Sequence, residues 1–138
     1  MEKILIVEDD PDIAKGLGVR LKSAGYEVTI APDALTGVYA ARQIQPDLAV
    51  LDISLPAGDG FTVADRICDL MPTTTPIIFL TASKRRWLRQ KAAQLGAAFF
   101  EKPYDADELL AAIQYAFRSR PAREADAANS RQATTTLS

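Results

Sequence analysis

Apolar residues along this chain follow two alternating patterns. Short, nearly unbroken apolar runs, such as residues 4–7 and 48–51, alternate with longer segments in which apolar residues recur every three or four positions. Unbroken runs are expected of parallel strands covered on both faces, and the longer spacing predicts amphipathic helices. The predicted strands are 3–8, 26–31, 47–52, 76–81 and 98–101, and the predicted helices are 11–24, 33–44, 60–70, 84–95 and 105–118.

Several of these helices carry boundary signals. Asp10 before Pro11 is typical of an N-cap followed by proline at the first helical position. Asp105, three residues before a glutamate, has the spacing of a capping box. Gly25 and Gly96 follow the first and fourth predicted helices and favour a left-handed helix end.

Five strand–helix alternations predict a doubly wound α/β domain over residues 1–120. Right-handed crossovers leave few topologies, and we expect a three-layer (βα)5 fold with a five-stranded parallel sheet in the flavodoxin-like order 2-1-3-4-5. Residues 121–138 are rich in Ala, Thr, Ser and Arg without apolar periodicity. They are predicted to be a disordered tail or the truncated start of a linker.

Composition narrows the function classes. The formal net charge of −2 predicts no general attraction to nucleic acid or to anionic membranes. No apolar run approaches the ~20 residues of a membrane span, so a cytoplasmic location is expected. The chain has no histidine, which excludes Ser-His-Asp and Cys-His catalysis and histidine-ligated metals. The single cysteine, Cys68, lies among apolar helix positions and is expected to be buried and inert.

Polar residues follow four of the predicted strands at their carboxyl ends. Glu8 and Asp9 follow the first strand, Asp52 ends the third, Thr81 ends the fourth, and Lys102 follows the fifth. The carboxyl ends of parallel strands meet at one edge of the sheet, where ligands bind. Each of these residues taken alone is ordinary, as a cap, a strand end or a surface lysine. Their conjunction predicts one pocket.

Three converging carboxylates must be neutralised. At ~5 Å and an effective dielectric constant of ~20, each pair repels by roughly 3 kcal/mol. A raised pKa or a hard divalent cation would relieve this, and a ligand set made only of oxygen favours Mg²⁺, with Mn²⁺ as the alternative. Lys102 and Thr81 would complete a phosphoryl clamp. Asp52 is then the natural nucleophile, forming an aspartyl phosphate.

These motifs resemble the receiver domains of two-component response regulators, in particular stand-alone receivers of the chemotaxis type. The resemblance covers about residues 2–118 and rests on ILIVEDD at 4–10, LAVLDISLPAGDGF at 48–61, IIFLTAS at 77–83, LGA at 95–97 and FFEKP at 99–103. It implies that Asp52 accepts phosphate, that Asp9 ligates Mg²⁺ directly and that Glu8 acts largely through water. It also implies that Asp52 and the backbone carbonyl of Ser54 complete the metal ligands, while Asp10 remains a helix cap.

The resemblance also implies a conformational switch. Thr81 matches the hydroxyl that moves toward the phosphoryl group, and Lys102 matches the lysine that bridges the acceptor carboxylate and the phosphate. The Lys102–Pro103 bond matches a cis-peptide. Residues 96–102 are one residue shorter than the usual spacing, so the switch aromatic is Phe99 when counted from Lys102 and Phe100 when counted from Gly96. Phe99 is preferred because strand parity is fixed relative to the lysine.

By the same resemblance, the chain would be a phosphorylation-activated switch rather than an enzyme, with only self-phosphotransfer and autodephosphorylation. A histidine kinase or a phosphotransfer protein would donate phosphate to Asp52. The surface of the fourth helix, fifth strand and fifth helix would then shift and bind a downstream protein or a second copy of the chain. A cluster of five cations at residues 84–91 surrounds Trp87 on this surface, and it is either a solvated helix face or a docking surface for an acidic partner.

Three rival functions fit the sequence less well. A phosphatase of the haloacid-dehalogenase type would use Asp10 and Asp12 after the first strand, but it needs a further acidic motif after the lysine strand, for which the chain is too short. A flavodoxin-like FMN site would need a phosphate-cradling loop where this chain has an acidic triplet. A receiver used only for docking would not need the complete set of site residues.

Overall fold

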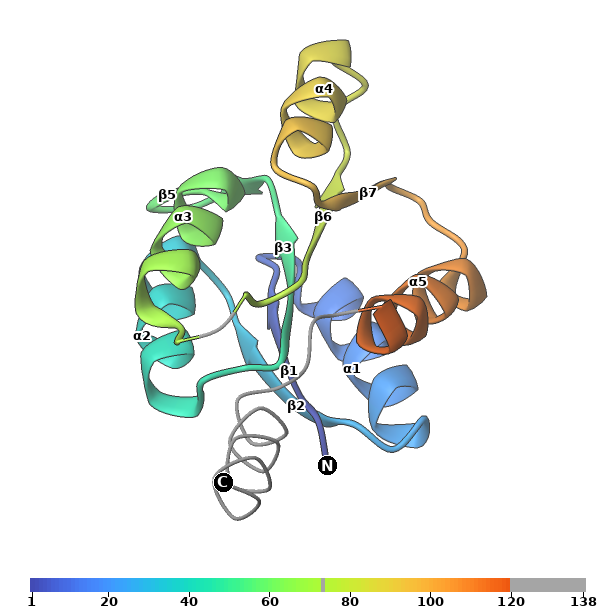
Figure 1. Ribbon diagram of the computed structural model, residues 1–138. Helices are drawn as coiled ribbons and strands as arrows, with labels where there is room; N and C mark the ends of the chain where they lie inside the picture. The colour runs from blue at the N-terminus through green and yellow to red at the C-terminus, as the bar shows by residue number, and fades with distance from the viewer. Residues whose placement is uncertain (73, 120–138) are drawn as a thin grey trace, which may run out of the picture.

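The computed structural model describes residues 1–72 and 74–119, so the predicted tail at 121–138 lies outside the described residues. Five parallel strands form the central sheet in the order β2-β1-β3-β6-β7 (Figure 1), which confirms the predicted topology. The strands are β1 (Lys3–Val7), β2 (Glu27–Ala31), β3 (Leu48–Asp52), β6 (Ile77–Thr81) and β7 (Ala98–Glu101). The helices are α1 (Pro11–Ser23), α2 (Ala34–Ile44), α3 (Gly60–Leu70), α4 (Arg86–Gln94) and α5 (Ala106–Ser119).

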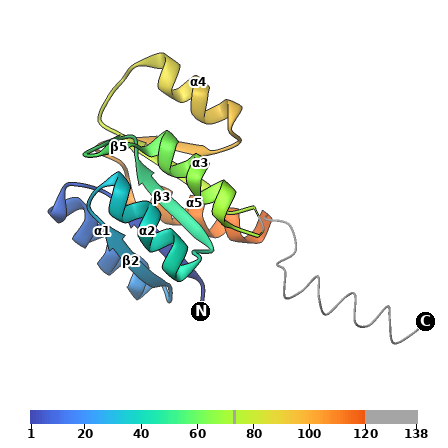
Figure 2. The ribbon, with the colours of Figure 1, turned by 90° about the vertical axis from the view of Figure 1, so that its left-hand side faces the viewer.

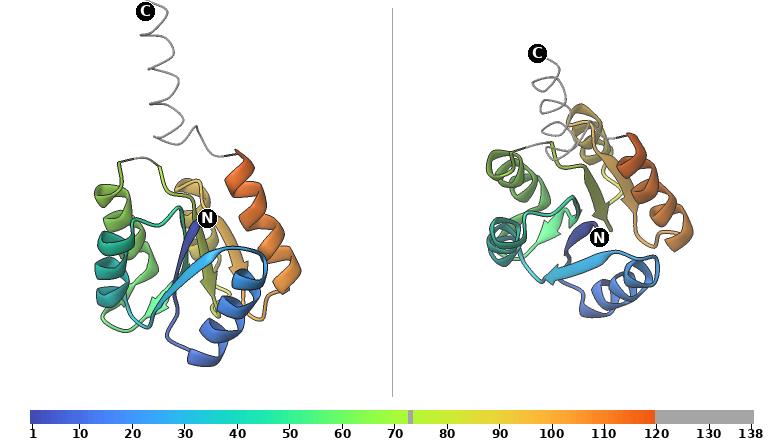
Figure 3. Two further views of the ribbon diagram at one scale, coloured as in Figure 1. Left: turned by 90° about the horizontal axis from the view of Figure 1, so that it is seen from below. Right: turned by 60° about the horizontal axis from the view of Figure 1, so that its bottom comes forward.

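Helices cover both faces of the sheet, so its central strands are buried on both sides. Figure 3 shows α1 and α5 on one face and α2 and α3 on the other. Every residue of β3 is buried, as is every residue of β1 after Lys3. Successive side chains point to opposite faces, so Ile4 and Ile6 join the core beneath α1 and α5, whereas Leu5 and Val7 join the other core. This burial explains why these strands are unbroken apolar runs.

Helix α4 lies apart from α2 and α3, at the β6–β7 side of the sheet (Figures 1 and 2). Only Leu88 and Ala92 of α4 are buried, and both join the core on the α2–α3 face. The helix begins at Arg86 rather than at residue 84, and no side chain caps its amino end. The later start is consistent with this missing cap, because an amino end without a capping side chain leaves backbone donors unsatisfied.

The other helix boundaries follow the sequence signals. The Asp10 carboxylate accepts hydrogen bonds from the amides of Asp12 and Ile13, with Pro11 at the first helical position. Asp105 accepts from the amides of residues 107 and 108 at the start of α5. Gly25 and Gly96 have φ values of 98° and 70°, which only glycine adopts without strain.

A short hairpin that the apolar pattern did not predict connects β3 to α3. Its strands, β4 (Ser54–Leu55) and β5 (Gly58–Asp59), pair antiparallel. The hairpin returns the chain so closely that a Cβ atom on Gly60 would lie 2.4 Å from the backbone oxygen of Asp52. Glycine is therefore required at position 60 to bring α3 against the end of β3.

The expectation for Cys68 is wrong. Cys68 is exposed, although Ile67 beside it is fully buried. Position 68 lies one residue outside the buried stripe of α3, which consists of Gly60, Phe61, Val63, Ala64 and Ile67. A helix turns by about a quarter to a third of a circle per residue, so an adjacent residue can leave the core completely.

Among the described residues, none of the helices is both long and apolar enough to span a membrane.

Candidate functional site

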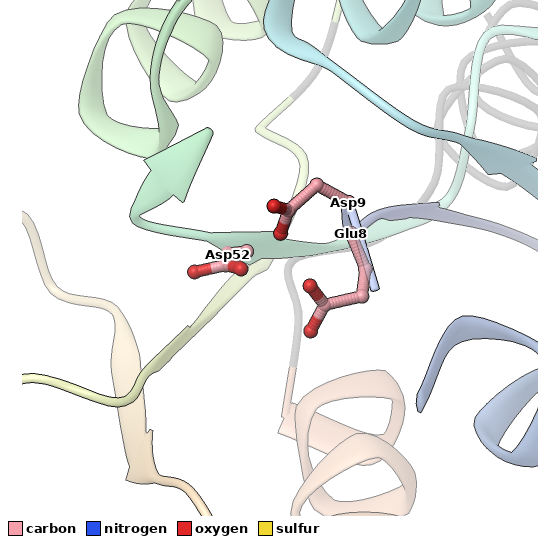
Figure 4. Close-up of side chains that lie close together, drawn as sticks. All are labelled: Glu8, Asp9 and Asp52. Carbon is pink, nitrogen blue, oxygen red and sulfur yellow. The ribbon is translucent and has the colours of Figure 1, made fainter. Parts of the chain in front are cut away.

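The carboxyl ends of β1 and β3 bring three carboxylates together. Glu8 and Asp9 follow β1, and Asp52 is the last residue of β3. One carboxylate oxygen from each lies within 4.8 Å of the others, and Figure 4 shows the three groups facing a shared space. Glu8 and Asp52 are only 2% and 3% exposed, whereas Asp9 is open to solvent. The pocket predicted from the strand ends therefore exists for these three residues.

Lys102, which follows the carboxyl end of β7, extends into the same pocket. Its ammonium nitrogen donates a hydrogen bond of 2.9 Å to Asp52 Oδ2 and forms an ion pair with Glu8 Oε1. Burial alone would lower the pKa of this ammonium, but its contacts with the Glu8 and Asp52 carboxylates outweigh burial and leave the pKa raised. Lys102 is thus a fixed cation beside Asp52. The peptide bond between Lys102 and Pro103 is cis.

Glu8 is the most perturbed acid of the site. Burial and, to a smaller extent, its interaction with Asp52 raise its pKa to about 7, while the Lys102 ammonium acts in the opposite direction. Its Oε2 accepts a hydrogen bond of 3.2 Å from the Asp10 amide. Its buried Oε1 touches Lys102 but accepts no well-oriented hydrogen bond. A buried acceptor with spare capacity beside two other carboxylates fits a hard cation with oxygen ligands.

The loops around Asp52 add backbone donors and a hydroxyl. The Ser54 amide donates to Asp52 Oδ1 over 3.0 Å, which fixes the orientation of the carboxylate. Thr81 is fully buried at the end of the neighbouring strand β6. In the β3–β6 register, Asp52 is paired with Leu80, and Thr81 is the next residue. Its hydroxyl oxygen accepts a hydrogen bond of 3.0 Å from the Ser83 amide. The Lys102 amide donates to the Thr81 carbonyl over 2.7 Å and so ties the two strand ends together.

The two aromatic candidates on β7 lie on opposite faces of the sheet. Phe99 packs on the core beneath α2, α3 and α4, and Phe100 packs on the core beneath α1 and α5. Phe99 is paired in register with Phe79, and Thr81 is two residues beyond Phe79, so Thr81 and Phe99 share a face. The geometry is therefore compatible with a coupled movement of Thr81 and Phe99.

The sequence did not predict that Arg89 of α4 contacts two residues of β7. Its guanidinium carbon lies 4.8 Å from the centroid of the Phe99 ring, and its Nη2 lies 2.8 Å from Glu101 Oε1. Residues 99 and 101 point to the same face of the strand, so one side chain contacts both. The only sequence signal was the presence of cations in this helix, which does not indicate which of them faces the sheet.

The structure also separates Asp10 from the site. The Asp10 carboxylate is used in capping α1, as the sequence predicts, and Asp10 is exposed. A phosphatase of the haloacid-dehalogenase type would need that carboxylate as its nucleophile. Asp52, by contrast, is buried, contacts the Lys102 ammonium and lies close to Glu8 and Asp9. Of these two aspartates, Asp52 belongs to the buried pocket and Asp10 does not.

Comparison with known proteins agrees with this arrangement. The model of the response regulator receiver domain family matches residues 4–114, and the chain belongs to this family. The protein is 38% identical over 120 residues to the DNA-binding dual master transcriptional regulator RpaA of Synechocystis sp., covering 86% of this chain and 50% of that protein. It is also 38% identical over 123 residues to the transcriptional activator protein IrlR of Burkholderia pseudomallei, covering 88% and 53%.

Solved structures show the same fold. The non-phosphorylated HemR receiver domain from Leptospira biflexa superposes with a TM-score of 0.79 at 34% identity, covering 89% of this chain and all of that one. A CheY-like receiver domain from Methanospirillum hungatei gives a TM-score of 0.77 at 30% identity, covering 83% and 92%. The protein is thus a receiver domain of the two-component class, a family that typically acts as a switch. It spans about half the length of the curated relatives named above.

Proposed function

We propose that the protein is a signalling switch that accepts a phosphoryl group on Asp52 from a histidine kinase or a phosphotransfer protein. The observation that carries this proposal is the position of Asp52, which is buried at a strand end, 2.9 Å from the Lys102 ammonium and close to two further carboxylates. Isolated surface aspartates have no such surroundings. The chain is proposed to catalyse nothing beyond its own phosphorylation and dephosphorylation.

Glu8, Asp9 and Asp52, with the backbone carbonyl of Ser54, are proposed to hold Mg²⁺, or Mn²⁺ in its place. All of these would be oxygen ligands, which suits either ion, and the buried Oε1 of Glu8 supports the assignment because it has acceptor capacity left. When bound, the metal would offset the charge of the carboxylates and of the incoming phosphate. We expect Glu8 to ionise fully only when a cation is present, because burial holds its pKa near 7.

The residues of the chain then have separate tasks in phosphoryl transfer. A carboxylate oxygen of Asp52 attacks phosphorus, the bond from phosphorus to the donor breaks, and the donor leaves with the bonding electron pair. With acetyl phosphate as donor, the leaving group is acetate. The Ser54 amide keeps the acceptor carboxylate oriented, and the Lys102 ammonium stabilises the charge that accumulates on the phosphoryl oxygens. Lys102 stays protonated throughout.

Phosphorylation is proposed to shift the surface formed by α4, β7 and α5. The added charge of about −1.5 to −2 would attract the Thr81 hydroxyl, which must give up the Ser83 amide in order to move. Phe99, on the same face, is the proposed switch aromatic that fills the vacated space. The Arg89 contacts to Phe99 and Glu101 would carry this change to α4.

The output is proposed to be a contact with a downstream protein, and a homodimer through α4, β7 and α5 is the alternative. The chain is proposed neither to bind nucleic acid directly nor to associate with a membrane, and it is proposed to be cytoplasmic. Residues 1–120 are proposed to form the receiver domain, in agreement with the family match to residues 4–114.

The decisive experiment is intact-mass spectrometry after treatment with acetyl phosphate. We expect one added phosphoryl group in the presence of Mg²⁺, little without it, and none in Asp52→Asn. Asp69→Asn, an exposed aspartate on α3, is the matched control and should label like the unaltered chain. Full labelling of Asp52→Asn would refute the acceptor assignment. If the unaltered chain is not labelled, the proposed phosphorylation is wrong, and the alternative of a receiver that acts only by docking is favoured.

A further inference from the structure

Helix α4 and the two residues before it carry a cluster of five cations. Lys84, Arg85, Arg86, Arg89 and Lys91 lie within eight positions, and α4 contains no acidic residue. Arg89 pairs with Glu101, and the Lys91 ammonium lies 4.5 Å from the centroid of the Phe61 ring. No ion pair joins the other three cations within the described ranges 1–72 and 74–119.

Lys84, Arg85 and Arg86 oppose the stability of the helix at whose start they lie. The amino end of a helix has a partial positive charge, so cations there are unfavourable and acids are favourable. The first turn of α4 has no acid, and Arg85 at the N-cap makes no side-chain capping bond. The other helices for which caps are described all begin with a capping aspartate. Local folding therefore gives no reason for a basic sequence at this position, and binding of an anionic group would.

An open cleft lies directly beside these cations. It encloses about 730 Å³ between α4 and the β3–α3 connection, within the ~300–1,000 Å³ range of ligand clefts. Arg85, Trp87 and Lys91 line it on the α4 side, while Asp9 and Asp59 line it on the other. Trp87 is 52% exposed and offers a large apolar surface next to the charges.

The charge distribution of the cleft selects among anionic partners. A nucleic acid carries a negative charge at every phosphate, so its backbone would be repelled by the acidic wall of Asp9 and Asp59. A polypeptide, by contrast, can have carboxylates opposite the cations and neutral, apolar residues opposite the acidic wall. We propose that α4 and this cleft bind an acidic polypeptide segment, with carboxylates on Arg85 and Arg86 and an apolar side chain against Trp87.

Binding of an acidic segment to this cleft would not require phosphorylation of Asp52. It can be tested on the unphosphorylated full chain without Mg²⁺ or a phosphodonor, so its failure is distinct from failure of the proposed function. Trp87 is the only tryptophan of the chain, so its intrinsic fluorescence reports directly on the cleft. The probe is a short acetylated peptide with two leucines between glutamates, and the control peptide has glutamines in place of the glutamates.

We expect the glutamate peptide to change Trp87 fluorescence saturably, the glutamine peptide to bind at least about tenfold more weakly, and added salt to weaken binding. Arg85→Glu with Arg86→Glu should weaken binding by at least about tenfold as well. The matched control, Lys15→Glu with Lys22→Glu, reverses two exposed cations on α1 and should bind normally. If the Arg85 and Arg86 reversal disturbs the circular dichroism spectrum, glutamine at both positions replaces it and should also weaken binding.

Four results would overturn the proposal. They are the absence of saturable binding by the glutamate peptide, equal binding of both peptides, equal loss in the α1 control, and tighter binding of a single-stranded oligonucleotide than of the peptide.

Discussion

Replacing Lys102 by methionine tests the electrostatics of the site most directly. The change keeps an unbranched chain of similar length and removes the ammonium that contacts both Glu8 and Asp52. The side chains of these acids are only 1% and 4% exposed, so water cannot replace the lost cation without opening the pocket. Removing one partner of a buried ion pair typically costs 3–5 kcal/mol, and we expect a loss of about 3 kcal/mol at about pH 8.

This loss should shrink as the pH falls. Burial raises the folded-state pKa of Glu8 from 4.5 to about 7, and the Lys102 ammonium is one of the groups that restrain the rise. In Lys102→Met the folded state keeps its proton to a higher pH than the unfolded state does. The free energy of unfolding therefore decreases as the pH rises through about 4.5 to 7 and above, and it recovers in acid.

Titration of Lys102 does not produce this trend. Its pKa is raised above the usual 10.5, so its contribution to stability is fully present below that value and is lost only as the pH rises through the folded-state pKa. The lysine is charged in both states between about pH 5 and 8. The pH dependence in this range therefore comes from Glu8.

Urea unfolding followed by circular dichroism at about pH 5 and pH 8 measures the effect. Lys22→Met, on an exposed lysine of α1, is the matched control and should change stability little at either pH. Mg²⁺ at a hundred times its dissociation constant should restore up to about 2.7 kcal/mol to the variant at pH 8. If Lys102→Met unfolds at the same urea concentration as Lys22→Met at both pH values, the buried ion-pair reasoning is wrong.

Three further perturbations test other parts of the structure. Gly60→Ala should lower the free energy of unfolding by about 1–3 kcal/mol and slow phosphorylation by acetyl phosphate, because the new Cβ would lie 2.4 Å from the Asp52 backbone oxygen. Gly16→Ala, where a Cβ would meet open space, is the control and should not destabilise the protein in urea unfolding. Asp10→Ala should lose about 1 kcal/mol with the α1 cap yet keep its Mg²⁺ affinity, measured by calorimetry. Cys68 should react with Ellman's reagent in the native state, but more slowly than in urea, because burial first and nearby acids second raise its pKa.

Local signals in the sequence were sufficient for the five strands of the main sheet and for the presence of the five helices. Continuous apolar runs predicted the strands because both faces of this sheet are covered, and the Asp10–Pro11 pair predicted the start of α1 because an N-cap acts within three residues. The strand order and the meeting of Glu8, Asp9 and Asp52 at one edge followed from the general rules of parallel sheets. The short β4–β5 hairpin and the start of α4 gave weaker local signals and were missed or misplaced.

Tertiary structure alone decided how these groups contact one another. The sequence gives no sign that Glu8 is buried against Lys102 with a pKa near 7, because that depends on the exclusion of water by segments remote in the chain. Nor does it show that Arg89 reaches Phe99 and Glu101 while Arg85 faces an open cleft, since both are simply arginines near the start of one helix. Periodicity is a property of neighbouring residues, whereas burial and pairing depend on distances that exist only after the chain has folded.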